Sequence, residues 1–366
     1  MNCTQADIAR ALGVSQAAVC LAVGNARSAR RSRLSNEMCQ KIRAKALEMG
    51  YRPARTARIL RTGRTTSIMI LNFGGFSEPS AQRTYETGRL ANEAGFNFDV
   101  VDAYWHHDDI DRVVEGVLNS RPLAVIVTGA MQPNFPTERL IHAGIHVVGN
   151  GISVPGCPWV RYDARAAIRK ITETAIATGR RRLALLVKDP DKDSQSWQLQ
   201  ERRQGFFDAV TAAGARVREY HEGATDFGFS KNSRDVDAVM VSTPSQHPSF
   251  QDAKGGHDLT ESLMAARVTP DMLVCSNDAF AIGAMSVCCR KQARIPDDVA
   301  LSGFDNIALS AHVEIPLTTV EQPTVEMCKA ALQLIQKKIR HRTTLSPQPE
   351  EHVFPCQIIW RQSTSN

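Results

Sequence analysis

The chain has 366 residues, of which 43% are hydrophobic and 22% are charged. This length favours two or three domains, and this composition excludes a disordered or a fibrous protein. No apolar run approaches the roughly 18 residues of a membrane span. Residues 1–23 also lack the basic and apolar regions of a signal peptide, so we expect a cytoplasmic protein.

Positive charge is concentrated at the start of the sequence. Residues 1–66 contain 13 Lys and Arg against 3 Asp and Glu, whereas the remaining 300 residues contain 31 against 35. A basic head on a mildly acidic body is typical of a polyanion-binding module joined to a separate sensor. Nucleic acid and an anionic membrane both fit this charge. The head has no amphipathic helix with large apolar residues opposite a basic face, so we expect nucleic acid and no membrane partner.

The beginning of the chain has the capping signals of two short helices. Thr4, with Asp7 three residues later, predicts the start of a first helix that ends before Gly13. Gly13 readily adopts the positive φ of a tight turn. Ser15 predicts the cap of a second helix that runs to about Val23.

The spacing of small and apolar residues indicates a helix-turn-helix. Ala9, Gly13 and Val19 stand where two crossing helices need a small contact, a tight turn and a core plug. The side chains expected to face inward from the second helix are Ala18, Val19, Ala22 and Val23, and those expected to face a major groove are Gln16, Ala17, Cys20 and Leu21. A plain helical hairpin with no DNA-binding role is the alternative.

A third helix is expected to close the core of the head. It is capped by Ser35, and its apolar residues are Met38, Ile42, Ala46, Leu47 and Met49. The preceding residues 27–33 form a basic loop suited to phosphate oxygens. Together, the second helix, the loop and the third helix favour a DNA-binding unit over a generic helix pair.

The segment 51–64 is short and heavily basic. Pro53 can start a helix and Gly63 can end one, but a helix of about ten residues is marginal alone. We therefore expect it to form when DNA and a second copy of the chain supply contacts, with Leu60 as an apolar wedge in the minor groove. A solvated linker is the alternative. The residues predicted to contact DNA are Thr4, Ser15, Gln16, Ala17, Leu21, Asn25, Arg30, Arg31, Arg55, Ala57, Arg58 and Leu60.

The head resembles that of the lac repressor/gal repressor family of bacterial transcription regulators. The resemblance is carried by Asp-Ile-Ala at 7–9, Gly-Val-Ser at 13–15, Gly-Tyr-Arg-Pro at 50–53 and Leu-Arg-Thr-Gly-Arg-Thr at 60–65. It implies that Leu60 is an intercalating leucine and Ala57 its close-packing neighbour. The departures from the family pattern are Ala18 and Cys20 for a Thr and a Ser, Leu21 for a frequent Arg, and Ala54 for a common Asn. The operator sequence therefore does not follow from the resemblance.

After residue 66, short apolar runs alternate with amphipathic segments, which indicates parallel β-sheets covered by helices. The expected strands are 68–71, 96–101, 124–128, 146–148, 183–187, 238–241, 272–275 and 299–302, and the first expected helix is 82–94. The pattern suits one large sheet or two Rossmann-like lobes with a crevice between them. The resemblance, which spans nearly the whole chain, implies two lobes of the periplasmic-binding-protein type. We thus expect a DNA-binding domain at 1–50, a hinge at 51–66 and a two-lobe α/β body at 67–366.

The body carries further motifs of the same family in order. They are Val-Arg-Tyr-Asp at 160–163, Ser-Asn-Asp at 276–278, Gly-Phe-Asp-Asn at 303–306 and a return crossover at 316–320. By the resemblance, Arg202, Asn277 and Asp305 bind a small effector, commonly a sugar. A fork-shaped Arg, an amide and a carboxylate also suit vicinal hydroxyls on chemical grounds. Capping of the following helices is the alternative for Asn277 and Asp305, and the two roles are compatible.

Other side chains are candidates for the same crevice. Asn150 follows a predicted strand, and Trp197, Phe227 and Trp105 could cover a pyranose face, although a half-buried aromatic is more often part of a core. Among other motifs, there is no GxGxxG or P-loop, and residues 75–79, 106–109 and 189–200 fail the patterns of a nucleophile elbow, a metal site and a calcium loop. The nine cysteines include no CxxC pair. We therefore expect no enzyme, cofactor or metal.

These observations predict a homodimeric regulator that grips a pseudo-palindromic site in double-stranded DNA. A ligand that closes the crevice would alter the dimer and bias folding of the hinge. One alternative is a solute-binding transport protein, which would need a signal peptide and no basic head. Another is a regulator controlled by a protein partner, with no sugar effector.

Overall fold

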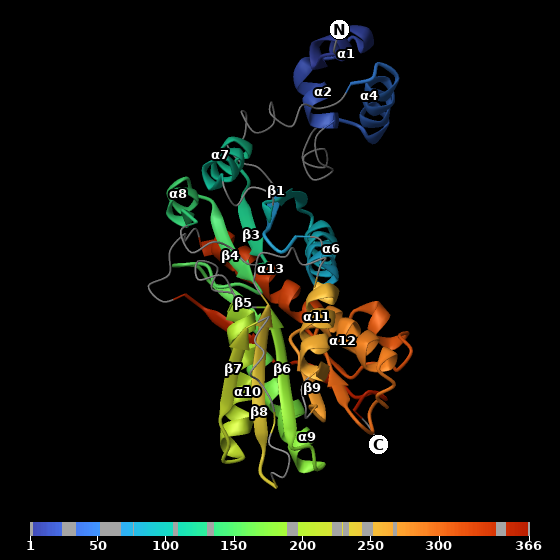
Figure 1. Cartoon of the computed structure of the whole chain (residues 1–366). Coiled ribbons are helices and arrows are strands. Elements are labelled where there is room, and N and C mark those ends of the chain that lie inside the picture. The colour runs from blue at the N-terminus through green and yellow to red at the C-terminus, as the bar shows by residue number, and fades with distance from the viewer. Residues whose placement is uncertain are drawn as a thin grey trace. The chain divides into compact units, whose positions relative to one another are not determined.

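The computed structural model describes residues 3–23, 34–51, 67–75, 77–104, 109–129, 135–188, 197–221, 229, 234–243, 252–265, 269–341 and 349–364. The chain forms two compact units, Met1–Thr65 and Thr66–Asn366, which we call the head and the body (Figure 1). Among the described residues, no single helix is long and apolar enough to cross a membrane, although the bent pair of the first two helices passes by length and composition.

The head contains three described helices, α1 (Gln5–Leu12), α2 (Gln16–Val23) and α4 (Asn36–Glu48). Its buried core consists of Ile8, Ala9, Val19, Ala22, Cys39, Ile42 and Ala46. The prediction that Leu47 belongs to this core is wrong, because its side chain is 85% exposed. Cys39, Ile42 and Ala46 follow each other at helical spacing on one face of α4, and Leu47 lies about 100° further round the helix.

The first lobe of the body is a six-stranded parallel sheet in the order β12-β5-β4-β3-β1-β2. Its strands are β1 (Ser67–Asn72), β2 (Asn97–Asp102), β3 (Ala124–Thr128), β4 (His146–Asn150), β5 (Trp159–Tyr162) and β12 (Glu351–Phe354). Its helices are α6 (Glu78–Glu93), α7 (Ile110–Ser120), α8 (Thr137–His142) and α13 (Thr324–His341). Alternate residues of β1 and β3 pack against α6 and α13 on one face and against α7 and α8 on the other. Figure 1 labels these helices around the strands of the sheet.

The second lobe is a five-stranded parallel sheet in the order β10-β9-β6-β8-β7. Its strands are β6 (Arg182–Lys188), β7 (Val217–His221), β8 (Asp237–Thr243), β9 (Met272–Cys275) and β10 (Ala300–Ser302). Its helices are α9 (Ala164–Ala177), α10 (Trp197–Ala212), α11 (Asp252–Ala265), α12 (Asp278–Arg290) and the short 3-10 helix η3 (Ala308–Ala311). Helices α9 and α10 cover one face, and α11 and α12 cover the other. The predicted two-lobe α/β body is confirmed, and the single-sheet alternative is wrong.

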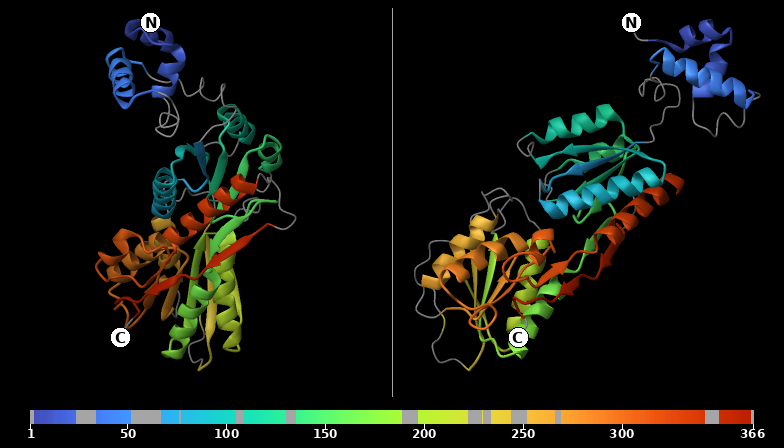
Figure 2. Two further views of the ribbon diagram at one scale, coloured as in Figure 1. Left: turned by 180° about the vertical axis from the view of Figure 1, so that it is seen from behind. Right: turned by 90° about the vertical axis from the view of Figure 1, so that its right-hand side faces the viewer.

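The chain crosses between the lobes three times. It passes from β5 into α9, from β11 (Thr319–Glu321) into α13, and from β12 into β13 (Gln357–Ile359). The crossings lie side by side, because β11 pairs with β13 and the amide of Asp163 donates to the carbonyl of Phe354 at 2.9 Å. Figure 2 shows the last strands running from one lobe into the other.

Candidate functional site

The first two helices of the head are capped as the sequence predicts. The Thr4 hydroxyl accepts a hydrogen bond from the Asp7 amide at 3.3 Å, and the Thr4 amide donates to Asp7 Oδ2 at 3.0 Å. Gly13 adopts φ 62°, and the Ser15 hydroxyl accepts from the Ala18 amide at 3.1 Å. The axes of α1 and α2 bend by 111°. Caps, turn and angle together form a helix-turn-helix.

Helix α2 leaves one face exposed. Val19 and Ala22 are completely buried, whereas Gln16 and Ala17 are exposed and Leu21 is 38% exposed. Cys20 and Ala18 are half-buried. The face that the sequence assigns to DNA is therefore free within the described head. The other predicted DNA contacts, Asn25, Arg30, Arg31, Arg55, Ala57, Arg58 and Leu60, lie outside the described residues, as do the aromatic candidates Trp105 and Phe227.

Arg202 of α10 is the centre of a buried cluster at the boundary between the lobes. Its guanidinium donates to the Tyr162 hydroxyl at 3.1 Å and to Asp305 Oδ1 at 3.1 Å, and it also donates to the Ser276 carbonyl. It stacks on the Phe304 ring at 3.7 Å from the ring centroid. Only 6% of Arg202 is exposed. Two residues that the sequence predicts for the effector, Arg202 and Asp305, therefore do lie in contact.

Asp305 stands in the loop that follows β10. Its φ of 108° is unusual for a residue with a side chain, and such backbone is costly unless the surroundings hold it. Gln322 Nε2 donates to its Oδ1 at 2.6 Å, in addition to Arg202. Burial raises the pKa of Asp305, although the Arg202 guanidinium and the Gln322 amide act in the opposite direction. The carboxylate is thus fixed by two donors from different segments.

Gln322 extends this contact into the first lobe. Its Oε1 accepts a hydrogen bond from Arg83 Nη2 at 3.1 Å. Arg83 lies on α6, and Gln322 lies at the crossing into α13. We call the connected residues the inter-lobe network: Arg83, Gln322, Asp305, Arg202 and Tyr162. This chain of hydrogen bonds joins α6 and β5 of the first lobe to α10 and the β10 loop of the second.

Asn277 caps a helix and also contacts a carboxylate. Its Oδ1 accepts from the Phe280 amide at 2.9 Å, which is the N-cap bond of α12. Its Nδ2 donates to Asp252 Oδ2 at 2.8 Å, and Lys188 pairs with the same carboxylate at 3.9 Å. Burial raises the pKa of Asp252, and Lys188 acts against this effect. The predicted capping role is confirmed, and the effector role of Asn277 stays a prediction.

Asn150 and Trp197 lie on the two sides of the lobe boundary. Asn150 is fully buried at the end of β4, and its Nδ2 contacts Cys328 Sγ at 3.4 Å. Trp197 at the start of α10 donates from Nε1 to the Gly151 carbonyl at 3.0 Å, and its ring lies 5.4 Å from that of Tyr162. The indole therefore anchors one lobe to the other. Its use as a ligand platform stays a prediction.

Sequence reasoning missed Arg83, Gln322 and Tyr162 as members of the site. A charged residue in an amphipathic helix is normally placed on the solvent face, so Arg83 gave no signal of burial. Tyr162 lies inside the motif at 160–163, which was recognised without a role for its hydroxyl. Gln322 follows the crossover motif at 316–320 by two residues and carries no pattern of its own.

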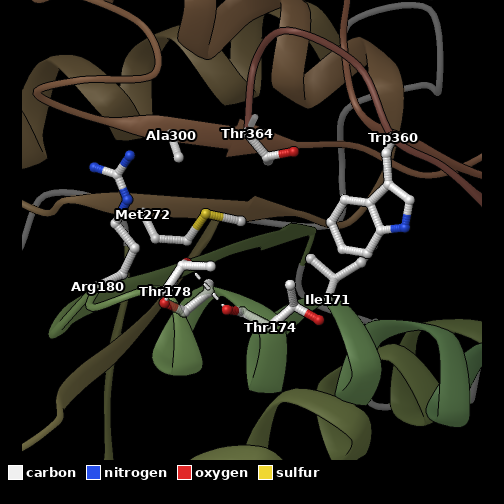
Figure 3. A pocket seen from close by; sticks show the side chains of 9 residues that line it. Ile171, Thr174, Thr178, Arg180, Met272, Ala300, Trp360 and Thr364 are labelled. Atoms are coloured by element: carbon white, nitrogen blue, oxygen red, sulfur yellow. Dashed lines mark hydrogen bonds between the residues drawn. The ribbon is translucent and has the colours of Figure 1, made fainter. Parts of the chain in front are cut away.

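A cavity of about 310 Å³ lies elsewhere in the second lobe (Figure 3). It is lined by Ile171, Thr174, Ala175, Thr178, Arg180, Met272, Ala300, Trp360 and Thr364. Met272 and Ala300 begin β9 and β10, so this cavity is at the amino ends of the strands. The candidate effector residues Asn277 and Asp305 follow the carboxyl ends of the same strands. The cavity is therefore not the predicted effector site.

Curated proteins similar to this chain span nearly its whole length. The ribose operon repressor of Escherichia coli (strain K12) is 22% identical over 357 residues, which cover 93% of this chain and 94% of that protein. The HTH-type transcriptional regulator GalR of the same strain is 25% identical over 371 residues, which cover 98% of this chain and 95% of that protein. The sucrose operon repressor of Escherichia coli is 27% identical over 371 residues, covering 98% of both chains. These relatives are transcription regulators and not enzymes.

Solved structures share the fold. A lac repressor dimer bound to operator and the anti-inducer ONPF has a TM-score of 0.78 at 17% identity and covers 100% of this chain and 99% of its own. The complex of the transcriptional regulator CelR with cellobiose has a TM-score of 0.64 at 22% identity, and the match covers 99% of this chain and 100% of that chain. At these identities, the likeness establishes the architecture of the chain.

Two family models match the body. One describes a periplasmic binding protein-like domain and matches residues 172–364, and the other describes periplasmic binding proteins and the sugar binding domain of the LacI family and matches residues 84–248. A helix-turn-helix head on such a body defines a transcription regulator with a two-lobed sensor. The chain belongs to the lac repressor/gal repressor family of transcription regulators. A solute-binding transport protein, the alternative from the sequence, is not favoured.

Proposed function

We propose that this regulator is a cytoplasmic repressor, which binds a pseudo-palindromic operator as a homodimer and responds to a small hydroxylated ligand between its lobes. The observation that carries the proposal is the buried contact of Arg202 with Asp305, Tyr162 and Ser276. It brings a forked donor and a carboxylate together where segments of both lobes meet. Such a pair can donate to one hydroxyl of a sugar and accept from its neighbour.

Two features support a sugar as the ligand. Asn277 adds an amide beside Ser276, and Asn150 adds a second amide from the first lobe, whose Oδ1 has no hydrogen-bond partner among the described residues. Relatives are named for the ribose and sucrose operons, and CelR has a solved complex with cellobiose. We infer that Arg202, Asn277, Asp305, Asn150 and Trp197 contact the ligand of this chain.

The head supplies the DNA-binding half of the proposal. The exposed Gln16, Ala17 and Leu21 would read base edges in a half-site, and Thr4 and Ser15 would lie near phosphates at the helix starts. Residues 51–66 would form the hinge, in which Leu60 wedges into the minor groove at the centre of the operator. The solved lac repressor dimer on its operator supports this arrangement.

Coupling between ligand and DNA would pass through the lobe boundary. Trp197 Nε1 and Gln198 Nε2 of the second lobe both donate to the Gly151 carbonyl of the first lobe, at 3.0 and 2.6 Å. A ligand that replaces or strengthens bonds in this region changes the relative free energy of the open and closed lobes. The dimer then transmits that difference to the hinge.

The experiment has two stages. Binding to random duplexes, followed by sequencing of the bound fraction at moderate ionic strength, identifies the operator, and calorimetry with a panel of neutral and anionic sugars identifies the ligand. Arg202→Ala should weaken ligand binding by more than about tenfold, because a buried charged donor is lost. Arg203→Ala is the matched control, since Arg203 lies next along α10 and pairs with Glu219 at the surface.

Three outcomes decide the proposal. No preference for any duplex sequence would exclude an operator-binding repressor. Heat from a sugar that is unchanged in Arg202→Ala would place the ligand elsewhere. No heat from any sugar, with operator release by a cell extract that is lost on protease treatment, would favour control by a protein partner.

A further inference from the structure

Arg83 is a buried cation that makes no direct ion pair among the described residues, and the buried carboxylate of Asp305 is linked to it only through Gln322. Only 6% of its surface is exposed, and no carboxylate lies within ion-pair distance of it among the described residues. Its hydrogen bonds go to two neutral oxygens, Gln322 Oε1 at 3.1 Å and the Asn150 carbonyl at 3.5 Å. Its Nε is buried and finds no partner in the described part of the chain. An ionised side chain removed from water is costly unless a counter-charge compensates it.

The backbone leaves space for this guanidinium. Gly151 adopts φ 76°, and a Cβ at that position would lie 2.2 Å from Arg83 Nη1. Any larger residue at 151 would therefore displace the arginine. The glycine leaves room for the Arg83 head group at the end of β4, where it bonds to Asn150 and Gln322. Arg83 is therefore a buried side chain of the lobe boundary and not a surface arginine.

The charges of the inter-lobe network do not balance. It contains two guanidinium groups, those of Arg83 and Arg202, and one carboxylate, that of Asp305. The Asp305 carboxylate already accepts hydrogen bonds from Arg202 and Gln322. Gln322 is neutral. Its Oε1 accepts a hydrogen bond from Arg83, and its Nε2 donates one to Asp305. The nearby Asp252 is paired with Lys188 at 3.9 Å. The inter-lobe network therefore carries one positive charge in excess, and Arg83 is the group without a direct counter-charge.

Hydrogen-bonding groups without partners lie in the same region. Asn150 Oδ1 at the end of β4, Thr128 Oγ1 at the end of β3 and Ser276 Oγ after β9 are buried and find no partner among the described residues. Thr128 and Asn150 are register neighbours in the first sheet. These groups suit the hydroxyls of a ligand, and the Arg83 fork suits an oxyanion.

We propose that the ligand of this regulator is an anionic sugar or polyol, whose carboxylate or phosphate group pairs with Arg83 while its hydroxyls meet Arg202, Asp305 and Asn150. This assignment rests on the proposed function, because it names the class of ligand for the same site. The oxyanion supplies the charge that Arg83 lacks. A neutral sugar leaves that cation buried and unpaired, so the site discriminates against it.

The test is calorimetry on the full chain at constant ionic strength. Glucose, galactose, mannose and ribose are each compared with the corresponding uronate or aldonate and the terminal phosphate. At least one anion should bind about 10- to 100-fold more tightly than its neutral parent, and Arg83→Gln should remove that advantage. The carboxylate and phosphate arms identify which oxyanion is recognised. Arg169→Gln is the control, since Arg169 is an exposed arginine paired with Glu173.

Neutral sugars that bind as tightly as their anions, or an anion whose affinity survives Arg83→Gln, would overturn the inference but leave a sugar-responsive repressor intact. A second measurement applies even if no member of the panel binds. In the ligand-free protein, Arg83→Gln should raise the unfolding midpoint by at least about 2 °C, because an uncompensated cation is removed. An unchanged or lower midpoint would contradict the excess charge. Failure of the proposed function itself would appear separately, as loss of sequence-specific DNA binding.

Discussion

We expect the stability of the second lobe to depend on pH, because the carboxyl group of Asp278 is buried in it. Asp278 is fully buried at the first position of α12, where Thr319 Oγ1 donates to Oδ1 and the Ile307 amide donates to Oδ2 at 2.9 Å. Burial raises the pKa of Asp278 from 3.8 to about 7, and the hydrogen bond from Thr319 acts in the opposite direction. Asp305 also raises the pKa of this carboxyl, and Arg361 lowers it.

The direction and size of the effect follow from proton linkage. Because the folded protein holds this proton more tightly than the unfolded chain, the stabilisation is fully present below pH 3.8 and is lost as the pH rises through about 7. The interval between the two pKa values corresponds to roughly 4 kcal/mol in total. Between pH 5 and pH 8, the expected loss is roughly 2.5 kcal/mol.

The assay is urea unfolding of the wild type and Asp278→Asn at pH 5 and pH 8. Asparagine is neutral at both values and keeps an oxygen for the Ile307 amide, so the variant should lose most of the wild-type dependence and exceed it in stability at pH 8. Asp111→Asn, which changes an exposed carboxylate on α7, serves as the control. The same pH dependence in Asp278→Asn and wild type would refute the reasoning.

Three further predictions concern packing and DNA binding. Gly205→Ala should lower stability in urea by about 1–3 kcal/mol, because its Cβ would lie 2.3 Å from a backbone oxygen of α9. Gly116→Ala, which meets nothing within 4 Å, should cause no loss. In hydrogen exchange of the head, Ile42→Ala should cost about 2–5 kcal/mol and Leu47→Ala less than about 0.5. Leu60→Ser should weaken specific operator binding far more than nonspecific binding in titrations at matched salt, and equal losses would contradict a wedge role.

The strands that the sequence predicts best are those buried on both faces. Residues 124–128 and 183–187 are continuous apolar runs, because helices cover both sides of a parallel sheet, and they correspond to β3 and β6. Strands β7 and β12 were not predicted. Both are edge strands with mostly exposed or half-exposed residues, so neither produces an apolar run. Their place in the sheets depends on contacts with distant segments, which local periodicity does not contain.

The family resemblance assigned Asn277 and Asp305 to the candidate site. Their positions in the sequence agree with this assignment, because they follow the apolar runs 272–275 and 299–302 by two and three residues, and the carboxyl ends of parallel strands meet along one edge of a sheet. Arg83 was not predictable in this way, because its burial depends on Gln322, far along the chain, and on the absent side chain of Gly151. Leu47 shows the converse error, in which an apolar residue was assigned to a core that its angle on the helix does not reach.

The three side-by-side crossings have a mechanical consequence for the body. Because the three connections lie side by side, we expect them to resist twisting of one lobe against the other more than bending about the line that they share. The crossing at 354–357 also continues into residues that bond to the second lobe, where the Ser363 carbonyl accepts from the Leu301 amide at 2.9 Å. If the proposed ligand closes the lobes, we therefore expect the movement to be a rotation about the line of these crossings.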